Sequence, residues 1–265
     1  TGCSAADYDN DGDVDLYVLN YGPNVLYRNN GDGTFTDVSK ASGLDDPRWS
    51  VHAVWFDYNQ DGWLDVYVAN YLKYDDGKFR DFYPAQGYPG PLSYAGEPDR
   101  LYRNNGDGTF TDVTREAGVY RILYTMGCNI GDLDNDGWLD FYAATGAPDY
   151  RVLVPNLMFR NDQGRRFQDV TSSGGFGHLQ KGHGVAFGDL DNDGDQDIYA
   201  VMGGAYTGDV YQNVLFENPG HGNHWLTLKL EGTRSNRSAI GSRIRVRVEE
   251  NGRHRDIYVT VGTGG

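Results

Sequence analysis

Short apolar segments alternate with acidic, glycine-containing segments along most of this chain. SVHAVWF at 50–56 and HGVAFG at 183–188 precede two of the acidic segments, while LYVLN at 16–20 and VYVAN at 66–70 follow two of them. The apolar segments are rich in β-branched and aromatic residues and are too short for stable helices, so each predicts a β-strand. The pattern therefore predicts an all-β protein with tight turns.

A nine-residue acidic phrase occurs four times, which indicates a repeat. A second phrase follows each copy, at 26–44, 101–119 and 158–176, and in a degraded form at 215–230. Its LYRN and TFTDV segments predict two more strands joined at a hairpin turn. The copies of the acidic phrase, whose first residues lie 50, 75 and 57 residues apart, are DYDNDGDVD (7–15), DYNQDGWLD (57–65), DLDNDGWLD (132–140) and DLDNDGDQD (189–197).

Each repeat contains four predicted strands, and a repeat of this length with four strands is typical of a β-propeller blade. In the first blade we expect strands at roughly 1–6, 14–19, 24–28 and 33–38. We therefore predict a β-propeller of four-stranded blades, of which four are visible. Because the chain begins inside the first predicted strand, we expect further blades upstream of it.

The aligned acidic phrases place oxygen ligands at regular positions. Asp or Asn occupies positions 1, 3 and 5, Gly occupies position 6 and Asp occupies position 9. Alternating hard oxygen donors, closed by a Gly that permits a sharp turn, are the pattern that Ca²⁺ prefers, with the backbone carbonyl at position 7 as a further donor. We predict about four Ca²⁺ sites, with ligands from Asp7, Asp9, Asp11, Asp15, Asp57, Asn59, Asp61, Asp65, Asp132, Asp134, Asp136, Asp140, Asp189, Asp191, Asp193 and Asp197.

Two other interpretations compete with calcium loops. An EF-hand needs Glu at position 12 and two flanking helices, whereas these phrases have Val or Ala there, followed by strand-forming residues. The phrases are alternatively plain turns, but 17 acidic residues within four such short loops repel one another without a cation. We interpret NNGDG at 29–33 and 104–108 as hairpin turns. Because the second loop has Asn59 in place of a carboxylate, we predict that it binds Ca²⁺ most weakly.

The strand, D-x-D-x-D-G-x-x-D loop and strand unit resembles the FG-GAP or VCBS repeat of integrin α-chain propellers and bacterial extracellular proteins. NHWLTLKLEGTRSNRSAIGSRIRVRV at 223–248 resembles the opening of an ASPIC/UnbV module, here truncated at its C-terminal end. The two in this order are similar to the cartilage acidic protein-like secreted family. The resemblance implies a Ca²⁺-stabilised propeller, usually of seven blades, that is secreted, periplasmic or displayed on the cell surface.

Charge divides the chain into two predicted domains. The 265 residues include 23 basic and 38 acidic ones, a formal charge of −15, which argues against nucleic-acid binding. No apolar run is long enough for a membrane span. Residues 223–265 carry +4 and leave −19 for residues 1–222, so we expect a propeller at 1–222 and the start of a β module at 223–265. Arg243, Arg245 and Arg247 share one strand face, which either binds an acidic partner or, as we favour, docks on the acidic propeller.

An insertion at 71–98 separates the second and third strands of the second blade and is rich in Tyr, Pro and Gly. Tyr83 and Tyr88 are the candidate ligand-binding residues, in an aromatic platform for a glycan or a protein, although packing as a lid over the propeller is an equal alternative. Cys3 and Cys128 occupy equivalent positions of non-adjacent blades, so we expect two buried free thiols and no disulfide.

No catalytic motif stands out, and the histidines lack ligand-like spacing. We therefore expect a non-enzymatic, extracellular calcium-binding propeller that acts as an adhesion, ligand-binding or structural module. Its expected partners are an extracellular protein, a glycan or a second copy of itself. The alternative is a carbohydrate-active enzyme such as a polysaccharide lyase, which uses a base beside a cation on the propeller face.

Overall fold

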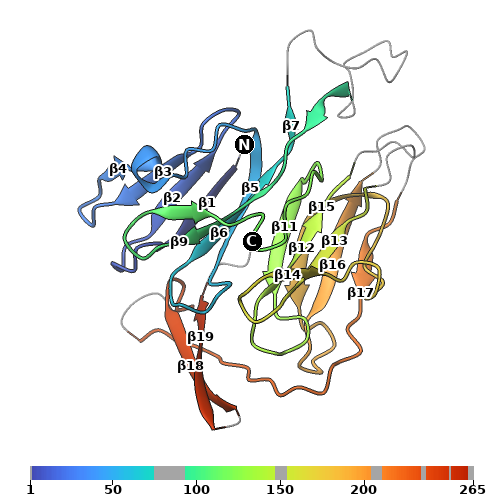
Figure 1. Cartoon of the computed structure of the whole chain (residues 1–265). Coiled ribbons are helices and arrows are strands. Elements are labelled where there is room, and N and C mark those ends of the chain that lie inside the picture. The colour runs from blue at the N-terminus through green and yellow to red at the C-terminus, as the bar shows by residue number, and fades with distance from the viewer. Residues whose placement is uncertain are drawn as a thin grey trace.

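The computed structural model is built almost entirely from small antiparallel sheets that lie one after another along the chain (Figure 1). It describes residues 2–74, 93–146, 154–203, 211–233, 237–250 and 252–261. Within these ranges no helix has the length and apolar character required to cross a membrane. The predicted all-β class is confirmed.

The first three sheets are four-stranded and hydrogen-bonded in the order expected for propeller blades. The predicted strands of the first blade agree with the observed ones to within two residues at each end. The strands of the three blades are β1 (Gly2–Ala6), β2 (Asp15–Leu19), β3 (Val25–Asn29) and β4 (Phe35–Asp37); β5 (Ser50–Phe56), β6 (Asp65–Asn70), β9 (Arg100–Asn104) and β10 (Phe110–Asp112); and β11 (Gly127–Gly131), β12 (Asp140–Ala144), β13 (Leu157–Asn161) and β14 (Phe167–Asp169).

The fourth blade differs from the prediction. It has three strands among the described residues, β15 (Lys181–Gly188), β16 (Asp197–Gly203) and β17 (Val214–Phe216). In the degraded phrase Pro219 stands where Asn30 and Asn105 donate the backbone N–H groups that close the hairpins of the first two blades, and Pro has no N–H to donate. The degraded phrase does not reproduce the hairpin of the other blades, and no strand forms at 217–230.

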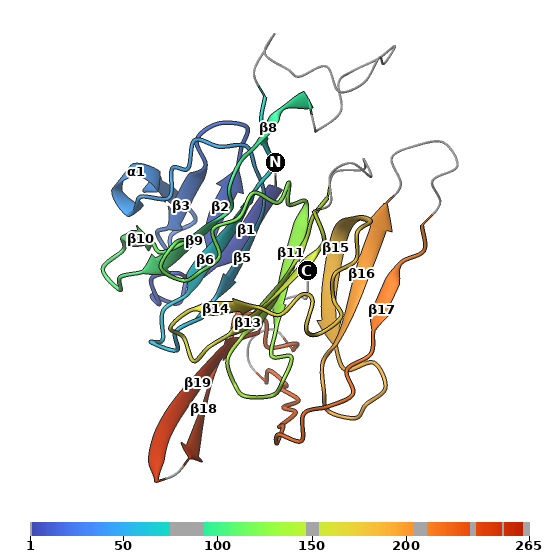
Figure 2. The same cartoon turned by 45° about the vertical axis from the view of Figure 1, so that its right-hand side comes forward.

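Three smaller elements lie outside the sheets of the blades. The short helix α1 (Ser39–Ser42) follows β4, and the ribbon of β7 (Leu72–Lys73) and β8 (Ala95–Gly96) closes the base of the insertion. The last element is the hairpin of β18 (Arg243–Glu250) and β19 (Arg253–Thr260), drawn in red below the blades in Figures 1 and 2. The proposed division at residue 223 stays a prediction.

The innermost strands of successive blades lie side by side, β1 with β5, β5 with β11 and β11 with β15. Apolar side chains fill the space between each pair of blades. The equivalent residues Tyr17, Tyr67 and Tyr142 of the second strands are fully buried there, whereas Tyr199 of β16 is 40% exposed. The outer face of the fourth blade is therefore solvent-exposed and apolar, because no described blade follows it.

An asparagine at or just after the end of each third strand fastens one blade to the preceding one. The Asn104 side-chain amide donates to the carbonyl of Tyr8 at 2.9 Å, and Asn161 donates to the carbonyl of Tyr58 at 2.9 Å. Asn218 likewise donates to the carbonyl of Leu133 at 2.7 Å. These bonds are buried and join residues about a hundred positions apart, so they specify how neighbouring blades dock.

We expect Asn104→Ala to lower the free energy of unfolding by about 2–4 kcal/mol, because the buried carbonyl of Tyr8 and the half-buried carbonyl of Leu64 lose their donor. Asn29→Ala is the matched control. Asn29 occupies the same position in the first blade, and its amide donates only to the exposed carbonyl of Val14 among the described residues. Denaturant unfolding of both variants measures the difference, and equal destabilisation would show that the inter-blade bond contributes little.

Candidate metal-binding loops

The four acidic phrases form loops between the first and second strands of the blades, and we number these acidic loops one to four in chain order. In each loop the first Asp accepts hydrogen bonds from the backbone N–H groups of positions 5 and 6. In the second loop Asp57 accepts from Asp61 at 3.1 Å and from Gly62 at 2.8 Å. The same pair of bonds occurs at Asp7, Asp132 and Asp189.

Two positions of every loop have left-handed backbone. Position 4 has φ between 53° and 64° and is Asn or Gln, while position 6 has φ between 85° and 96° and is always Gly. A Cβ at position 6 strains this conformation, which explains why the sequence places Gly there. The two left-handed residues bend each loop sharply between its ligand positions.

The ninth Asp ties the loop to the sheet. Asp65 accepts from the N–H of Tyr58 at 3.1 Å and from the N–H of Asn104 at 2.9 Å, and it is fully buried. Asp15, Asp140 and Asp197 make the equivalent bonds. This residue is thus a structural anchor of the third strand as well as a predicted ligand.

The carboxylates of the loops approach closely enough to share one cation. Asp132, Asp134 and Asp136 each offer an oxygen within 4.8 Å of the others, and Asp189, Asp191 and Asp193 do the same in loop four. In loop one the grouped residues are Asp7, Asp9 and Asp15. In loop two the acidic residues do not form such a group among the described residues; there the Asp61 N–H donates to Asp57 and the Asn59 amide donates to Asp61.

Two of these ligands contain a buried oxygen with no hydrogen-bond partner in the described part of the chain. They are Asp9 Oδ1 and Asp134 Oδ1, both at position 3. The Asp134 residue is only 8% exposed, and its other oxygen accepts from Arg160 at 2.6 Å. A buried carboxylate oxygen without a donor is unfavourable unless a cation binds it, so the residues present fit a Ca²⁺ ion.

Burial raises the pKa values of several loop carboxyls. Desolvation is the largest cause for Asp132, whose pKa rises to about 7, and nearby Asp136 and Asp134 raise it further. The pKa of Asp57 and that of Asp15 each rise to about 6, again mainly through desolvation. Burial also raises the pKa of Asp140 well above its usual range. Without a cation these carboxylates are therefore costly to ionise together.

Asn59 is expected to make loop two the weakest, and its geometry supports this prediction, because its amide nitrogen donates to Asp61 at 2.8 Å instead of offering a charge. We expect Asn59→Asp to tighten Tb³⁺ or Ca²⁺ binding at this loop by about tenfold. Trp63, at position 7, reports loop two through sensitised Tb³⁺ emission. Asn105→Asp, which adds the same charge in a hairpin turn, is the control. Finding loop two already the tightest would contradict the prediction.

The C-terminal hairpin rests on the acidic loops. Arg243 donates to the side chain of Asn10 and to the carbonyl of Gly62, and Arg255 donates to the carbonyl of Asp136 at 2.8 Å. Arg247 instead pairs with Asp256 across the hairpin at 2.7 Å. Of the three arginines predicted to share a face of β18, Arg243 alone contacts an acidic loop among the described residues. The contact of Arg255 comes from the neighbouring strand, β19. The docking interpretation of the basic strand therefore holds for Arg243 alone among the three.

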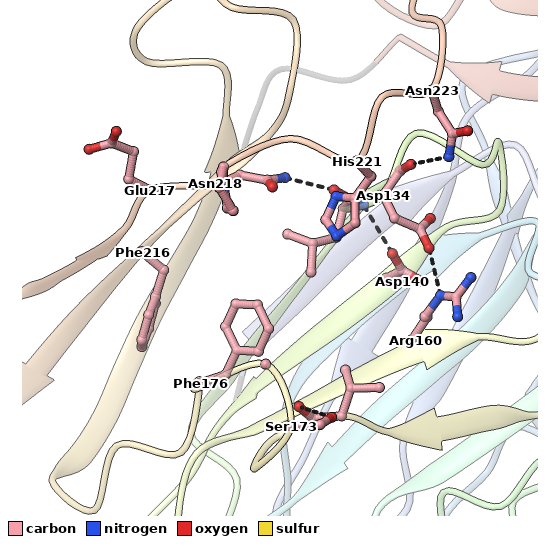
Figure 3. Close-up of a pocket in the computed structure, with 14 residues that line it drawn as sticks. Asp134, Asp140, Arg160, Ser173, Phe176, Phe216, Glu217, Asn218, His221 and Asn223 are labelled. Carbon is pink, nitrogen blue, oxygen red and sulfur yellow. Dashed lines mark hydrogen bonds and ion pairs between the residues drawn. The ribbon is translucent and has the colours of Figure 1, made fainter.

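A cavity of about 780 Å³ lies beside loop three, between the third and fourth blades (Figure 3). At the two earlier blade junctions an aromatic residue of a fourth strand packs against position 2 of the preceding loop, Phe110 on Tyr8 and Phe167 on Tyr58. The fourth blade has no such strand among the described residues. The cavity therefore occupies the corresponding place, with Asp134 and Arg160 on one wall and Phe176 and Phe216 on the other.

A family comparison matches these repeats directly. The model of the FG-GAP-like repeat matches residues 7–68, 87–143 and 145–200, which together make up more than half of the chain. The chain belongs to the FG-GAP-like repeat family. The three matched segments each contain one or two of the acidic loops, so the family match and the loop geometry concern the same residues.

Curated relatives match most of the FG-GAP chain, but the match covers only part of each relative. Cartilage acidic protein 1 of Homo sapiens is 26% identical over 245 residues, which cover 88% of this chain and 32% of the relative. Its Xenopus tropicalis counterpart is 27% identical over 244 residues, covering 88% and 33%. The chain thus spans about a third of the length of these relatives.

Two solved structures have a limited likeness to the FG-GAP chain. One is an Agrocybe aegerita lectin that recognises non-reducing terminal N-acetylglucosamine, with a TM-score of 0.42, 17% identity and coverage of 97% of this chain and 60% of the lectin. The other is rhamnogalacturonan lyase YesW, with a TM-score of 0.42, 18% identity and coverage of 76% and 40%. Similarity at this level transfers neither a ligand nor an activity.

The remaining candidate residues of the FG-GAP chain have mixed outcomes. Tyr83 and Tyr88 lie outside the described residues. Cys3 and Cys128 are both free, as expected, and the expected burial holds for Cys128. For Cys3 it is wrong, because this cysteine lies on β1 of the first blade, whose innermost strand has no described blade on its other side.

Proposed function

We propose that this chain is a non-catalytic, extracellular FG-GAP module in which Ca²⁺ bound by the acidic loops stabilises a surface for ligand binding or adhesion. The observation that carries the proposal is the unpartnered, buried Oδ1 of Asp134 within a cluster of three carboxylates. The repetition of the same loop in every blade supports it, because clusters of three carboxylates, as in loops one, three and four, are unfavourable without cations.

Each ion would join the first and second strands of a blade through ligands at positions 1, 3, 5 and 9. Bound Ca²⁺ supplies positive charge where the loop has only carboxylates. The chain's own residues do the rest, since backbone N–H groups orient the first and ninth Asp, and Arg160 holds Asp134 so that one of its oxygens stays available. Calcium in this position is structural.

An exposed aromatic cluster at the other end of the strands is the proposed ligand surface. We define it as Tyr21, Trp49, Tyr71, Tyr74 and Tyr94. The Trp49 ring contacts Tyr21 at 5.6 Å and Tyr71 at 5.5 Å between centroids, and Tyr21 is 60% exposed. The Trp49 indole N–H is buried without an acceptor among the described residues. Flat, partly exposed rings such as those of Tyr21 and Tyr74 suit stacking against an oligosaccharide.

Calorimetric titration with Ca²⁺ tests the metal part of the proposal. The parent protein is expected to bind about four ions, one per loop, and Asp134→Ala is expected to remove one of them, because it deletes the ligand that lacks a partner. Asp32→Ala, in an exposed hairpin turn, is the control and should leave the stoichiometry unchanged. Absence of heat and of any Tb³⁺ signal would refute the calcium role.

An immobilised oligosaccharide panel that includes uronate polymers tests the ligand surface. Tyr21→Ala and Tyr74→Ala are expected to weaken binding to any recognised glycan by about tenfold, while Phe35→Ala, an exposed aromatic on β4, leaves it unchanged. Equal loss in all three variants would count against the cluster. The lyase alternative stays a prediction, and release of unsaturated product from the uronate polymers would support it.

A further inference from the structure

The residue at position 4 of each acidic loop has a feature that metal ligation does not explain. Asn10, Gln60, Asn135 and Asn192 all have left-handed backbone, and all have a side-chain amide. Left-handed conformation alone favours Asn or Gly, yet Gln60 is neither. The property that all four share is therefore the side-chain amide. In the sequence, position 4 lies between the predicted ligands at positions 3 and 5.

The position 4 amides reach from each loop to the next. Asn10 donates to the carbonyl of Gly62 at 3.2 Å, and Asn135 donates to the carbonyl of Gly194 at 3.2 Å. Gln60 donates in the same way to the carbonyl of Gly137. The acceptor is in every case the position 6 Gly of the following loop. The three bonds form a ladder across all four loops, which we call the amide ladder.

Each acceptor glycine also orients a metal ligand. The N–H of Gly62 donates to Asp57 at 2.8 Å, and the N–H of Gly137 donates to Asp132 at 2.8 Å. The N–H of Gly194 donates to Asp189 at 3.1 Å. Each acceptor Gly thus makes two hydrogen bonds. Its carbonyl accepts from position 4 of the preceding loop, and its N–H orients the first Asp of its own loop.

Because the loops are hydrogen-bonded to each other, ordering one loop lowers the conformational entropy that is lost when the neighbouring loop is ordered. Repulsion between the carboxylates opposes the closed form of a loop, and a bound cation favours it. A closed loop holds the position 4 amide in place, and this amide helps to hold the Gly of the next loop in the conformation that its own cation requires. We propose that the amide ladder couples the loops, so that Ca²⁺ bound in one blade increases the affinity of the adjacent blade. The proposal rests on the proposed calcium role, and the coupling must be reciprocal.

The C-terminal hairpin contacts the first two rungs of the ladder. Arg243 donates to both Asn10 and Gly62, and Arg255 donates to Gln60 at 3.4 Å. The third rung, Asn135 to Gly194, has no hairpin arginine on it among the described residues. It is therefore the rung at which the effect of the amide can be measured without disturbing the hairpin.

The chain offers a matched control for this rung. Asn192 occupies position 4 of loop four, with φ of 64° against 53° for Asn135, and its side chain makes no hydrogen bond within the described residues. Substitution by Gly removes the amide at either position and keeps left-handed backbone accessible. Asn135→Gly breaks a rung, while Asn192→Gly makes the same chemical change at the end of the ladder.

The experiment measures Tb³⁺ affinity at loop three with loop four intact or disabled. Trp138, at position 7 of loop three, sensitises the emission, and Trp225→Phe removes the tryptophan whose ring lies against Gly194 in loop four. Asp189→Asn with Asp193→Asn disables loop four. We expect this to weaken Tb³⁺ binding at loop three by about fivefold or more in the parent and by less than about twofold in Asn135→Gly.

Asn192→Gly is expected to retain the full coupling of the parent. The proposal is overturned if disabling loop four weakens loop three equally in the parent and in Asn135→Gly, or not at all in the parent. Failure of Tb³⁺ and Ca²⁺ to bind any loop would instead refute the calcium role itself. If Asn135→Gly does not fold, Asn10→Gly with Trp63 as the reporter of loop two tests the first rung, with loop one intact or disabled and with Arg243→Ala in every variant, because Arg243 also donates to Asn10.

Discussion

Removal of Ca²⁺ is expected to lower the midpoint of thermal unfolding by about 10 °C or more. A ligand that binds only the folded state at a hundred times its Kd contributes about 2.7 kcal/mol per site. A protein of this size shifts by about 2–4 °C per kcal/mol. Even two responding loops of the four therefore produce a large change, and the ladder makes the loss of successive ions steeper than independent sites predict.

The measurement compares unfolding in excess EDTA with unfolding after Ca²⁺ is added back in excess. Mg²⁺ at the same free concentration should restore little, because it requires a strict octahedron and retains its waters. Asp9→Asn, which alters a buried unpartnered ligand, should reduce the shift, while Asp32→Asn at an exposed turn should not. An unfolding midpoint that is the same with and without Ca²⁺ would disprove structural calcium in these loops.

Much of the fold could be predicted because each repeat contains its own short strand and turn motifs. The acidic phrase begins at the end of one strand and finishes at the start of the next, so its position fixes β1 and β2 in the first blade and β11 and β12 in the third. The missing fourth strand of the last blade was not predicted. Its cause is also local, since Pro219 removes the backbone N–H that closes the equivalent hairpins, but the sequence alone does not show that the result is a cavity.

The candidate ligands were predictable, and the contacts that organise them were not. Positions 1, 3, 5 and 9 follow from ligand chemistry within one loop. The roles of Asn104 and Gln60 depend on where a second blade places a carbonyl, which no single repeat reveals. Alignment of the repeats offers one signal, since position 4 is Asn or Gln in all four loops. Arg160 is harder to predict, because its equivalents Arg28 and Arg103 have the same sequence context without the same ion pair among the described contacts.

The pH dependence of stability is expected to change sign when calcium binds. In the metal-free protein the folded-state pKa values of Asp132, at about 7, and of Asp57 and Asp15, at about 6, lie above the ordinary value of 3.8. The folded state then binds protons more tightly than the unfolded state. The stability these groups provide is present at pH 4 and is lost as pH rises toward 7, by up to about 1.4 kcal/mol per pH unit for each proton released.

With Ca²⁺ present the same carboxyls must be ionised to act as ligands, so protons and metal compete. Calcium affinity should weaken by about tenfold per pH unit for each displaced proton below pH 7, and stability in saturating calcium should rise from pH 5 to pH 7.5. His52, whose pKa is lowered by burial, loses its stabilising effect as pH falls in both states, so it cancels in the difference.

Thermal unfolding of resin-stripped protein at pH 5 and pH 7.5, with and without added Ca²⁺, measures this difference. The calcium-dependent shift in the midpoint should be small at pH 5 and large at pH 7.5, and Asp132→Asn should flatten the metal-free decline because it removes the group with the highest pKa of the three. A metal-free protein that gains stability between these pH values, by as much as the calcium-loaded one, would mean that the loop carboxylates ionise without mutual repulsion and need no cation to hold them together.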